Sequence, residues 1–235
     1  SGKTTTLYTA LNEINTIEKN IITVEDPVEY TLANINQAQI NEKAGITFAN
    51  YLRSILRQDP DVIMIGEIRD PQTAEIAVQA SVTGHLVLST VHTNDAPGAV
   101  TRLINMGTAP FMVASSVTGV VAQRLVRRIC LRCKQEVKPD NQERAFAGLA
   151  PGTSLFAGAG CEVCNYTGYK GRIAIYEVMT LSPELQNIIL QNVSTEEIRQ
   201  AAVSAGMITL KKDGLAKASK GLTTVKEIMR ACLRE

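Results

Sequence analysis

The sequence predicts an α/β protein whose central sheet is mostly parallel. Three short apolar runs rich in β-branched side chains alternate with helical segments in the first half of the chain, and this alternation favours a parallel sheet covered on both faces. Two Cys-x2-Cys pairs follow and predict an inserted metal-binding element. Serine and threonine residues with helix-capping spacing near the end predict a C-terminal helical subdomain.

The composition argues against two functional classes. Of 235 residues, 45% are hydrophobic and 20% are charged, which is ordinary for a globular protein with a sizeable core. The formal net charge is only +1, and aromatic residues make up 4% with no Trp. The chain therefore lacks the excess of basic residues and the aromatic side chains that are typical of a nucleic-acid-binding protein. No apolar run reaches the length of about 18 residues that a membrane span requires.

The first half of the chain contains the expected sheet and its helices. Apolar residues recur at three- and four-residue spacing over 4–18 and 47–58, which predicts two amphipathic helices. The apolar runs at 21–24, 61–65 and 85–90 predict three buried strands, and 35–40 is a further strand candidate. Helices are expected after Pro71 and at Asp95, whose carboxylate suits an N-cap.

The pattern changes after Arg128. Segment 134–160 is rich in glycine and proline and has no clear periodicity, and strand character returns at 173–178. Short helices capped at Ser182, Ser194 and Thr224 follow. We therefore expect three segments, which are a core at 1–128, a cysteine-bearing element at 129–170, and a strand with a helical subdomain at 171–235.

The first four residues have the chemistry of a phosphate-binding loop. In Ser1-Gly2-Lys3-Thr4, backbone N–H groups and a helix dipole would face the anion, Lys3 would reach the outer phosphates, and the Thr4 hydroxyl would bind Mg²⁺. The first glycine of such a motif lies five positions before Gly2. We therefore expect a fragment that begins inside the loop, with a strand upstream. A capped helix start is the simpler alternative for these four residues alone.

Three expected strands end in polar side chains. Glu25 and Asp26 follow the first, Glu67 and Arg69 the second, and His92 the third. In an open parallel sheet, ligands bind beyond the carboxyl ends of the strands, so these side chains should gather at one edge. Phosphoryl transfer to water needs a metal counter-charge, a group that orients water, and donors to the γ-phosphate. The sequence therefore predicts a site for phosphoryl transfer to water, since a solvated acid or a helix cap explains only single carboxylates.

Four stretches are distinctive enough to indicate a family. They are SGKTTTLY, VEDPVEY, RQDPDVIMIGEIRDPQTAEIAVQASVTGHLVLSTVHTNDA and AQRLVRR. In this order they closely resemble the phosphate loop, Asp box, Walker B and His box regions of the type II secretion and type IV pilus-assembly ATPases. The resemblance covers essentially the whole chain. It implies a RecA-like P-loop NTPase core that uses ATP and Mg²⁺ and works as a ring, normally a homo-hexamer, on the cytoplasmic face of the inner membrane.

The resemblance also assigns roles to residues. The residues that it places at the nucleotide are Ser1, Gly2, Lys3, Thr4 and Thr5. The residues that it places at magnesium are Thr4, Glu67 and Asp26. Glu67 corresponds to the Walker B acid, and Glu25 is the alternative candidate for polarising water. His92 would contact the γ-phosphate. Arg69 and His85 are further candidates, although a histidine that opens a buried strand is as often a core residue.

Four of the five cysteines have the spacing of a structural zinc site. Cys130 and Cys133 form one Cys-x2-Cys pair, and Cys161 and Cys164 form another after 27 residues. Each turn aims two thiolates at one tetrahedral centre, and Zn²⁺ would stabilise an intervening segment with a poor core. Redox pairs or inert buried thiols are the alternatives. Cys232 is expected to be a small core residue of a helix.

The four cysteines also indicate which branch of the family the chain resembles. Its assembly and secretion members commonly carry four cysteines here, and its pilus-retraction members lack them, so the pattern favours assembly or secretion. Segment 121–135 holds five basic residues and no acid. A solvated face or a subunit interface explains this, and the sharper hypothesis is that Arg124 or Arg127 reaches a nucleotide or a neighbouring subunit.

Partners and alternatives follow from the same reasoning. The resemblance implies an inner-membrane platform protein and a cytoplasmic adaptor as partners, membrane association through them, and no direct nucleic-acid contact. The machine could be a secretion pseudopilus, a type IV pilus or a DNA-uptake pilus. A RecA-like DNA translocase is disfavoured by the near-neutral charge. A non-enzymatic zinc docking module on a degenerate fold would predict damaged motifs, whereas Lys3, Glu25, Glu67 and His92 are present.

Overall fold

The structure is a computed structural model that describes residues 2–233. The chain divides into two compact units. The sheet unit comprises residues 3–120 and 179–205, and the cysteine unit comprises Gly2, 121–178 and 206–233. These boundaries differ from the three segments expected from the sequence because the C-terminal helices are shared between the units. Helices α7 (Pro183–Leu190) and α8 (Thr195–Ser204) belong to the sheet unit, and α9 (Leu210–Ser219) and α10 (Val225–Cys232) belong to the cysteine unit.

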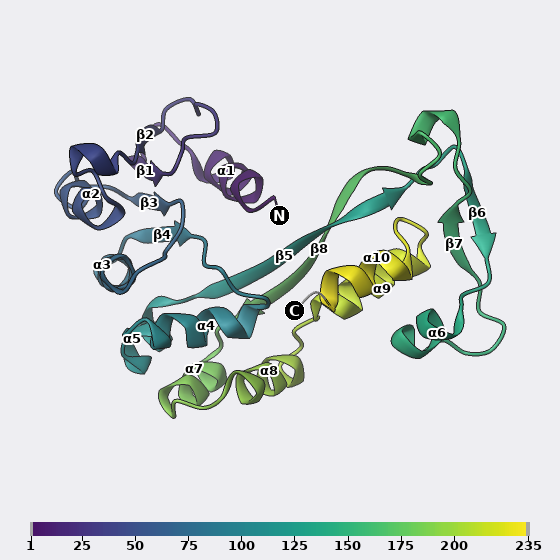
Figure 1. Cartoon of the computed structure of the whole chain (residues 1–235). Helices are drawn as coiled ribbons and strands as arrows, with labels where there is room; N and C mark the ends of the chain where they lie inside the picture. Colours follow the sequence, from purple (N-terminus) through teal and green to yellow (C-terminus); the bar gives the residue numbers. More distant parts are fainter. Residues whose placement is uncertain (1, 234–235) are drawn as a thin grey trace. The chain divides into compact units, whose positions relative to one another are not determined.

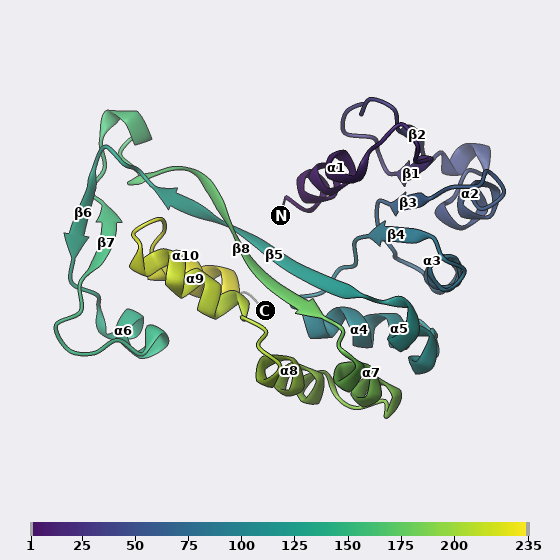
Figure 2. The ribbon, with the colours of Figure 1, turned by 180° about the vertical axis from the view of Figure 1, so that it is seen from behind.

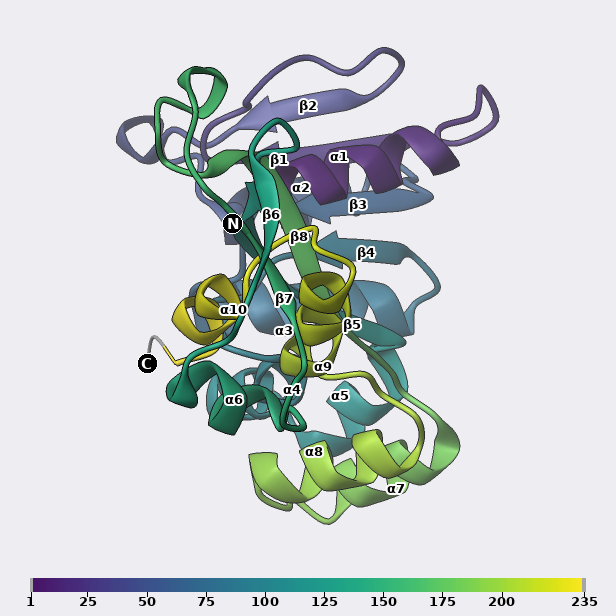
Figure 3. The ribbon, with the colours of Figure 1, turned by 90° about the vertical axis from the view of Figure 1, so that its right-hand side faces the viewer.

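The sheet unit is built on a parallel sheet of four strands in the order β2-β1-β3-β4 (Figures 1 and 2). The strands are β1 (Ile21–Glu25), β2 (Asn36–Gln39), β3 (Val62–Ile65) and β4 (Leu86–Ser89). Ile21 pairs with Val62, which in turn pairs with Leu86, so these three strands end at the same edge. Figure 3 shows β3 and β4 side by side and pointing the same way. The expected parallel sheet is confirmed.

The two central strands form the core of this unit. Every residue of β1 and β3 is buried, which is why both read as continuous runs of branched apolar residues. Helix α1 (Lys3–Ile14) covers one face, where Tyr8 and Leu11 cluster with Val62 and Met64. The expectation that 85–90 is a buried strand is wrong. Leu86 is 44% exposed, because β4 is an edge strand among the described residues.

The remaining helices of the sheet unit start where capping chemistry predicts. They are α2 (Phe48–Ile55), α3 (Pro71–Val82), α4 (Ala96–Asn105) and α5 (Pro110–Ser116), and a short 3₁₀ turn covers Glu42–Ala44. Asp70 and Asp95 accept N-cap hydrogen bonds from Thr73 and Gly98, and a proline follows in the first turn of each helix. Helix α5 packs on α3 and α7, and α4 packs on α8.

The cysteine unit consists mainly of two strand pairs and two helices. The long strands β5 (Gly119–Ile129) and β8 (Tyr169–Thr180) pair with each other, although their Gly119 and Thr180 ends lie in the sheet unit. The hairpin of β6 (Lys134–Val137) and β7 (Leu155–Gly158) is antiparallel and is closed by α6 (Asn141–Ala147), and a 3₁₀ turn covers Glu162–Cys164. Helices α9 and α10 bury Leu210 and Ile228 against Val126 and Ile175 of the β5–β8 pair.

The cap positions expected near the C-terminus are confirmed. Ser182, Ser194 and Thr224 accept backbone hydrogen bonds at the starts of α7, α8 and α10, and Ser194 forms a capping box with Glu197. Cys232 packs against the apolar cluster under α10, as expected of a small core residue. Within residues 2–233, no helix combines the length and apolar character needed to cross a membrane.

Candidate functional site

The end of the phosphate-loop motif lies at the start of α1. Ser1 is outside the described residues, and Gly2 has a φ of 78°, in the left-handed region that glycine favours. Lys3 is the first residue of α1, and its ammonium donates a hydrogen bond to the Val91 carbonyl at 3.0 Å. Thr4 is half-buried and Thr5 is exposed. The contact with Val91 brings the lysine of the motif to the loop that follows β4.

A second cluster lies just beyond the carboxyl ends of three strands. Glu67 follows β3 by two residues, and its Oε2 is 2.8 Å from His92 Nε2, which follows β4. The other Glu67 oxygen pairs with Arg69, whose guanidinium also reaches Asp26 beyond β1 at 3.9 Å. The structure therefore brings together the three strand-end clusters that the sequence predicts at one edge. Parallel strands with matched register are what align these ends.

The Glu67 carboxylate is ionised more readily than an ordinary one. Its side chain is only 12% exposed, and burial alone would raise the pKa. Hydrogen bonds and charge from Arg69 and His92 outweigh burial and lower the Glu67 pKa below its usual range. His92 is 73% exposed on its side chain, so the Glu67–His92 pair remains open to a ligand.

Glu25 has a different environment although it also ends a strand. The residue is 2% exposed, and its carboxylate accepts hydrogen bonds from the Tyr8 hydroxyl, from Thr23 at 2.7 Å and from Gln37 at 3.1 Å. These donors come from α1, β1 and β2. A carboxylate with this many donors is held in one orientation inside the sheet.

Three lower-ranked candidates belong to other parts of the chain. His85 precedes β4 and therefore lies at the opposite edge of the parallel sheet, where its Nδ1 is 2.9 Å from the Ala80 carbonyl at the end of α3. Arg124 and Arg127 belong to β5 in the cysteine unit. The Arg127 guanidinium is 2.8 Å from the buried Glu227 carboxylate and 4.1 Å from the centre of the Tyr169 ring. These contacts account for Arg127 inside its own unit.

Several residues near the site have no role assigned by the motifs. The sequence alone does not single out Tyr8, Gln37 or Arg199, yet the first two hold Glu25 and the third pairs with Asp95. Tyr8 lies on the buried side of α1, and this helical periodicity was the one available signal. Gln37 and Arg199 act through partners 12 and 104 residues away, and no local pattern encodes such contacts.

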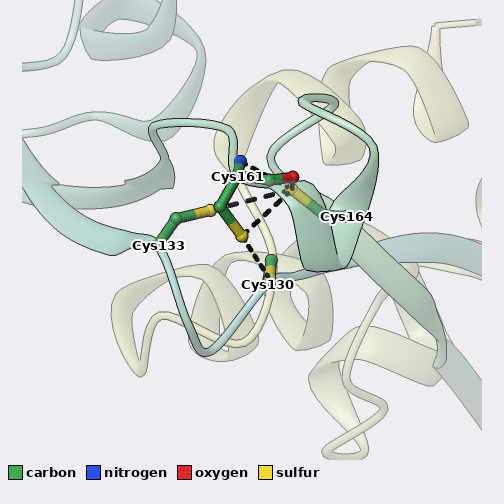
Figure 4. A group of neighbouring side chains, drawn as sticks. All are labelled: Cys130, Cys133, Cys161 and Cys164. Atoms are coloured by element: carbon green, nitrogen blue, oxygen red, sulfur yellow. Dashed lines mark hydrogen bonds between the residues drawn. The ribbon is translucent and has the colours of Figure 1, made fainter.

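The four cysteines of the two Cys-x2-Cys pairs converge (Figure 4). Their sulfur atoms all lie within 4.8 Å of one another. The Sγ atom of Cys130 is 3.9 Å from that of Cys161, and the Sγ atom of Cys164 is 3.8 Å from those of Cys133 and Cys161. A tetrahedral centre with Zn–S bonds of about 2.3 Å separates its sulfur atoms by about 3.8 Å. The donor set therefore fits a single metal ion of zinc's size and preference.

The backbone around the cysteines supports the same interpretation. N–H groups of Gly160, Cys161 and Gly168 donate to the sulfurs of Cys133 and Cys164 at 3.2–3.3 Å. Burial alone would raise the Cys164 pKa, yet the hydrogen bonds from Cys161 and Gly168 lower it to about 6, while burial and the neighbouring thiols raise the Cys133 pKa to about 11. Thiolate is the form that binds metal. A Cβ on Gly158 would overlap the Gly168 carbonyl, so this close backbone approach requires glycine.

Comparison with known proteins adds independent information. A model of the family described as "Type II/IV secretion system protein" matches residues 1–230. The type IV pilus assembly ATPase PilB of Thermus thermophilus is 51% identical over 233 residues, which cover 97% of this chain and 26% of that protein. Type II secretion system protein E of Dickeya dadantii is 50% identical over 235 residues, which cover 100% of this chain and 47% of that protein. The chain thus spans about a quarter to about half of these relatives.

A solved structure agrees with the fold. The crystal structure of the pilus retraction motor PilT with bound ADP matches with a TM-score of 0.73 and 28% sequence identity. The match covers 98% of this chain and 58% of that one. The resemblance inferred from the sequence motifs and the predicted α/β fold are both confirmed.

Proposed function

This chain belongs to the type II/IV secretion system protein family, and from that premise we propose that it is the ATP-hydrolysing part of a motor for type IV pilus assembly or type II secretion. Relatives named for both machines are 50–51% identical to it, so the proposal covers both. A homo-hexameric ring, an inner-membrane platform protein and a cytoplasmic adaptor are proposed as its partners on the family resemblance.

One observation carries the proposal. A continuous series of contacts joins the phosphate-loop lysine to a strand-end acid, because Lys3 donates to Val91, and the adjacent His92 contacts Glu67. Phosphoryl transfer to water requires a cation at the outer phosphates close to a group that orients the attacking water. Lys3 supplies the first and Glu67 the second, with His92 between them as a donor to the γ-phosphate.

Magnesium fits the same edge of the sheet. The carboxylates of Asp26 and Glu67 and the hydroxyl of Thr4 are oxygen donors of the kind that Mg²⁺ prefers, and we propose these three residues as its holders. When bound, Mg²⁺ neutralises charge on the phosphate oxygens. Arg69 spans Asp26 and Glu67 and keeps the two carboxylates from repelling each other.

We assign the two acids different roles. Glu67 is partly accessible and has an open histidine beside it, so it is the residue that positions and deprotonates water. Glu25 is 2% exposed and is enclosed by Tyr8, Thr23 and Gln37, so it fixes α1 to the sheet and thereby the orientation of Lys3. We also propose that Cys130, Cys133, Cys161 and Cys164 hold one structural zinc ion, on the strength of their sulfur spacing.

The test is ATP turnover by the full-length protein that contains this chain. Lys3→Ala should abolish steady-state hydrolysis while the protein stays folded, because the outer phosphates lose their cation. Lys19→Ala removes an exposed lysine just beyond α1 and serves as the matched control, with turnover expected near the wild-type rate. Wild-type turnover in Lys3→Ala would refute the assignment of the nucleotide site.

A further inference from the structure

The loop that carries His92 is held at both ends within the sheet unit. At its start, the Val91 carbonyl accepts the hydrogen bond from Lys3. At its end, Asp95 caps α4 and pairs with Arg199 of α8. His92 lies between these two anchors with its ring against Glu67. The position of the ring therefore depends on both anchors.

Asp95 uses each of its oxygens for a different partner. Oδ1 accepts the Gly98 N–H at 2.7 Å, which is an ordinary N-cap. Oδ2 pairs with the Arg199 guanidinium, which comes from a helix 104 residues further along the chain. A cap needs only the first contact. The second ties the loop to α8 through side chains that are 20% and 31% exposed, where solvent and salt screen an ion pair less than at an open surface.

The Arg199 guanidinium is itself fixed. Its Nε donates to Glu196 one turn earlier on α8 at 3.0 Å, so the planar group is oriented before it reaches Asp95. Beside it, the hydroxyls of Thr101 on α4 and Thr195 on α8 are 3.0 Å apart. Helix α8 is thus docked on α4 at these two places, and the Arg199 contact reaches the loop that carries His92.

We infer that Arg199 is a positioning residue for ATP hydrolysis, because its ion pair with Asp95 fixes the loop that places His92 against Glu67. The inference rests on the proposed function. Arg199 acts through Asp95, which lies three residues after His92 in the sequence. Releasing one end of the loop would let the His92 ring drift, and a displacement of about 1 Å in a catalytic group can cost up to roughly 100-fold in rate.

The experiment compares variants of the full-length protein by kcat and KM for ATP, with thermal melting as a check of folding. Arg199→Ala and Asp95→Asn should each lower kcat about tenfold or more and change KM less than about twofold, because binding by the phosphate loop is retained. Asparagine still caps α4 through its amide oxygen, so Asp95→Asn carries the test even if Arg199→Ala fails to fold. Arg199→Lys keeps the charge without the planar fork and should recover part of the rate.

Two comparisons separate positioning from general stability. The double variant Asp95→Asn/Arg199→Ala should be no slower than the slower single variant, because both changes break the same contact. Ser204→Ala changes an exposed position at the end of α8, leaves the Asp95 contact in place, and should keep a near-wild-type kcat. A folded Arg199→Ala with wild-type kcat, or a double variant whose loss is the product of the single losses, would overturn the inference. A wild-type protein without ATPase activity would instead refute the proposed function, and this inference with it.

Discussion

Glu25 and Glu67 end neighbouring parallel strands, yet their surroundings give them different chemistry. Glu25 is the last residue of the fully buried β1, where α1 and β2 supply donors to both of its oxygens. Glu67 lies beyond the end of β3, so one side of its carboxylate meets Arg69 and the other meets the exposed His92. Glu25, at the end of its strand, is therefore enclosed by the fold. Glu67, two positions beyond its strand, borders an exposed side chain, as our proposal for its action on water requires.

Tyr8 provides a pH-dependent test of the buried Glu25 network. Burial, followed by the Glu25 hydrogen bond and charge, raises the Tyr8 pKa from 10.0 to about 12. The folded state therefore keeps a proton that the unfolded state loses above pH 10, and stability must fall as pH rises from about 10 to about 12. Tyr8→Phe should cost roughly 1.5–3 kcal/mol at neutral pH, as expected for a hydrogen bond to a charged group.

The measurement is the free energy of unfolding of wild type and Tyr8→Phe in denaturant, at neutral pH and at several values up to pH 12. The advantage of the wild type should be constant below pH 10 and shrink above it. A difference that stays the same across this range would show that the Tyr8 hydroxyl is not held by Glu25.

Among the secondary-structure elements, the cysteine cluster joins four segments of the cysteine unit. It brings the ends of β5, β6 and β7 together with the 3₁₀ turn at Glu162–Cys164. Backbone contacts around it, such as the Cys130 N–H to the Gly168 carbonyl at 3.0 Å, depend on the cysteine turns keeping their shape. The metal would therefore stabilise the hairpin and its connection to β8.

We expect about one zinc ion per chain, and its removal by a chelator should lower the melting temperature of the cysteine unit. Cys161→Ser should lose the metal, while Cys232→Ser should retain it, because Cys232 packs in the apolar cluster under α10 and not in the cysteine cluster. Metal analysis of the purified protein and thiol titration check this. Four reactive thiols without zinc would contradict the site.

The docking of α10 on β5 gives a second prediction at this scale. The Glu227 carboxylate is 3% exposed and accepts from the backbone and the guanidinium of Arg127 and from Arg230. Burial alone would raise its pKa, but the Arg127 contacts lower that pKa below the usual range. Arg127→Leu leaves this buried charge short of a partner and should cost roughly 2–3 kcal/mol, below the roughly 3–5 of a fully buried pair, because Arg127 is half exposed and Arg230 remains.

The check is denaturant unfolding of Arg127→Leu beside Arg132→Leu, whose exposed side chain lies between the first two cysteines. Arg132→Leu should be nearly neutral for stability. If Arg127→Leu keeps wild-type stability and instead weakens ATP binding, the hypothesis that Arg127 serves a nucleotide replaces this structural role.

Across the whole molecule, the features that the sequence predicts correctly are those encoded by residues close together in the chain. The buried runs of β1 and β3, the proline-led helices and the serine and threonine caps each follow from a few neighbouring residues. Strand β5 was not predicted, because its three arginines interrupt the apolar pattern. The division into two units and the Asp95–Arg199 pair depend on contacts across more than a hundred residues, and a single sequence does not encode those locally.

We propose that ATP is hydrolysed beside Lys3, His92 and Glu67, with Glu67 acting on water. The most direct measurement is ATP affinity and single-turnover hydrolysis in the full-length protein, for Glu67→Gln and Glu25→Gln side by side. Glu67→Gln should bind ATP with near-wild-type affinity and hydrolyse it roughly 10²–10⁴ times more slowly, because it keeps the size but loses the base. Glu25→Gln should lose stability and keep hydrolysing wherever it remains folded. Normal hydrolysis by Glu67→Gln together with a folded but inactive Glu25→Gln would contradict the account and transfer the role to Glu25.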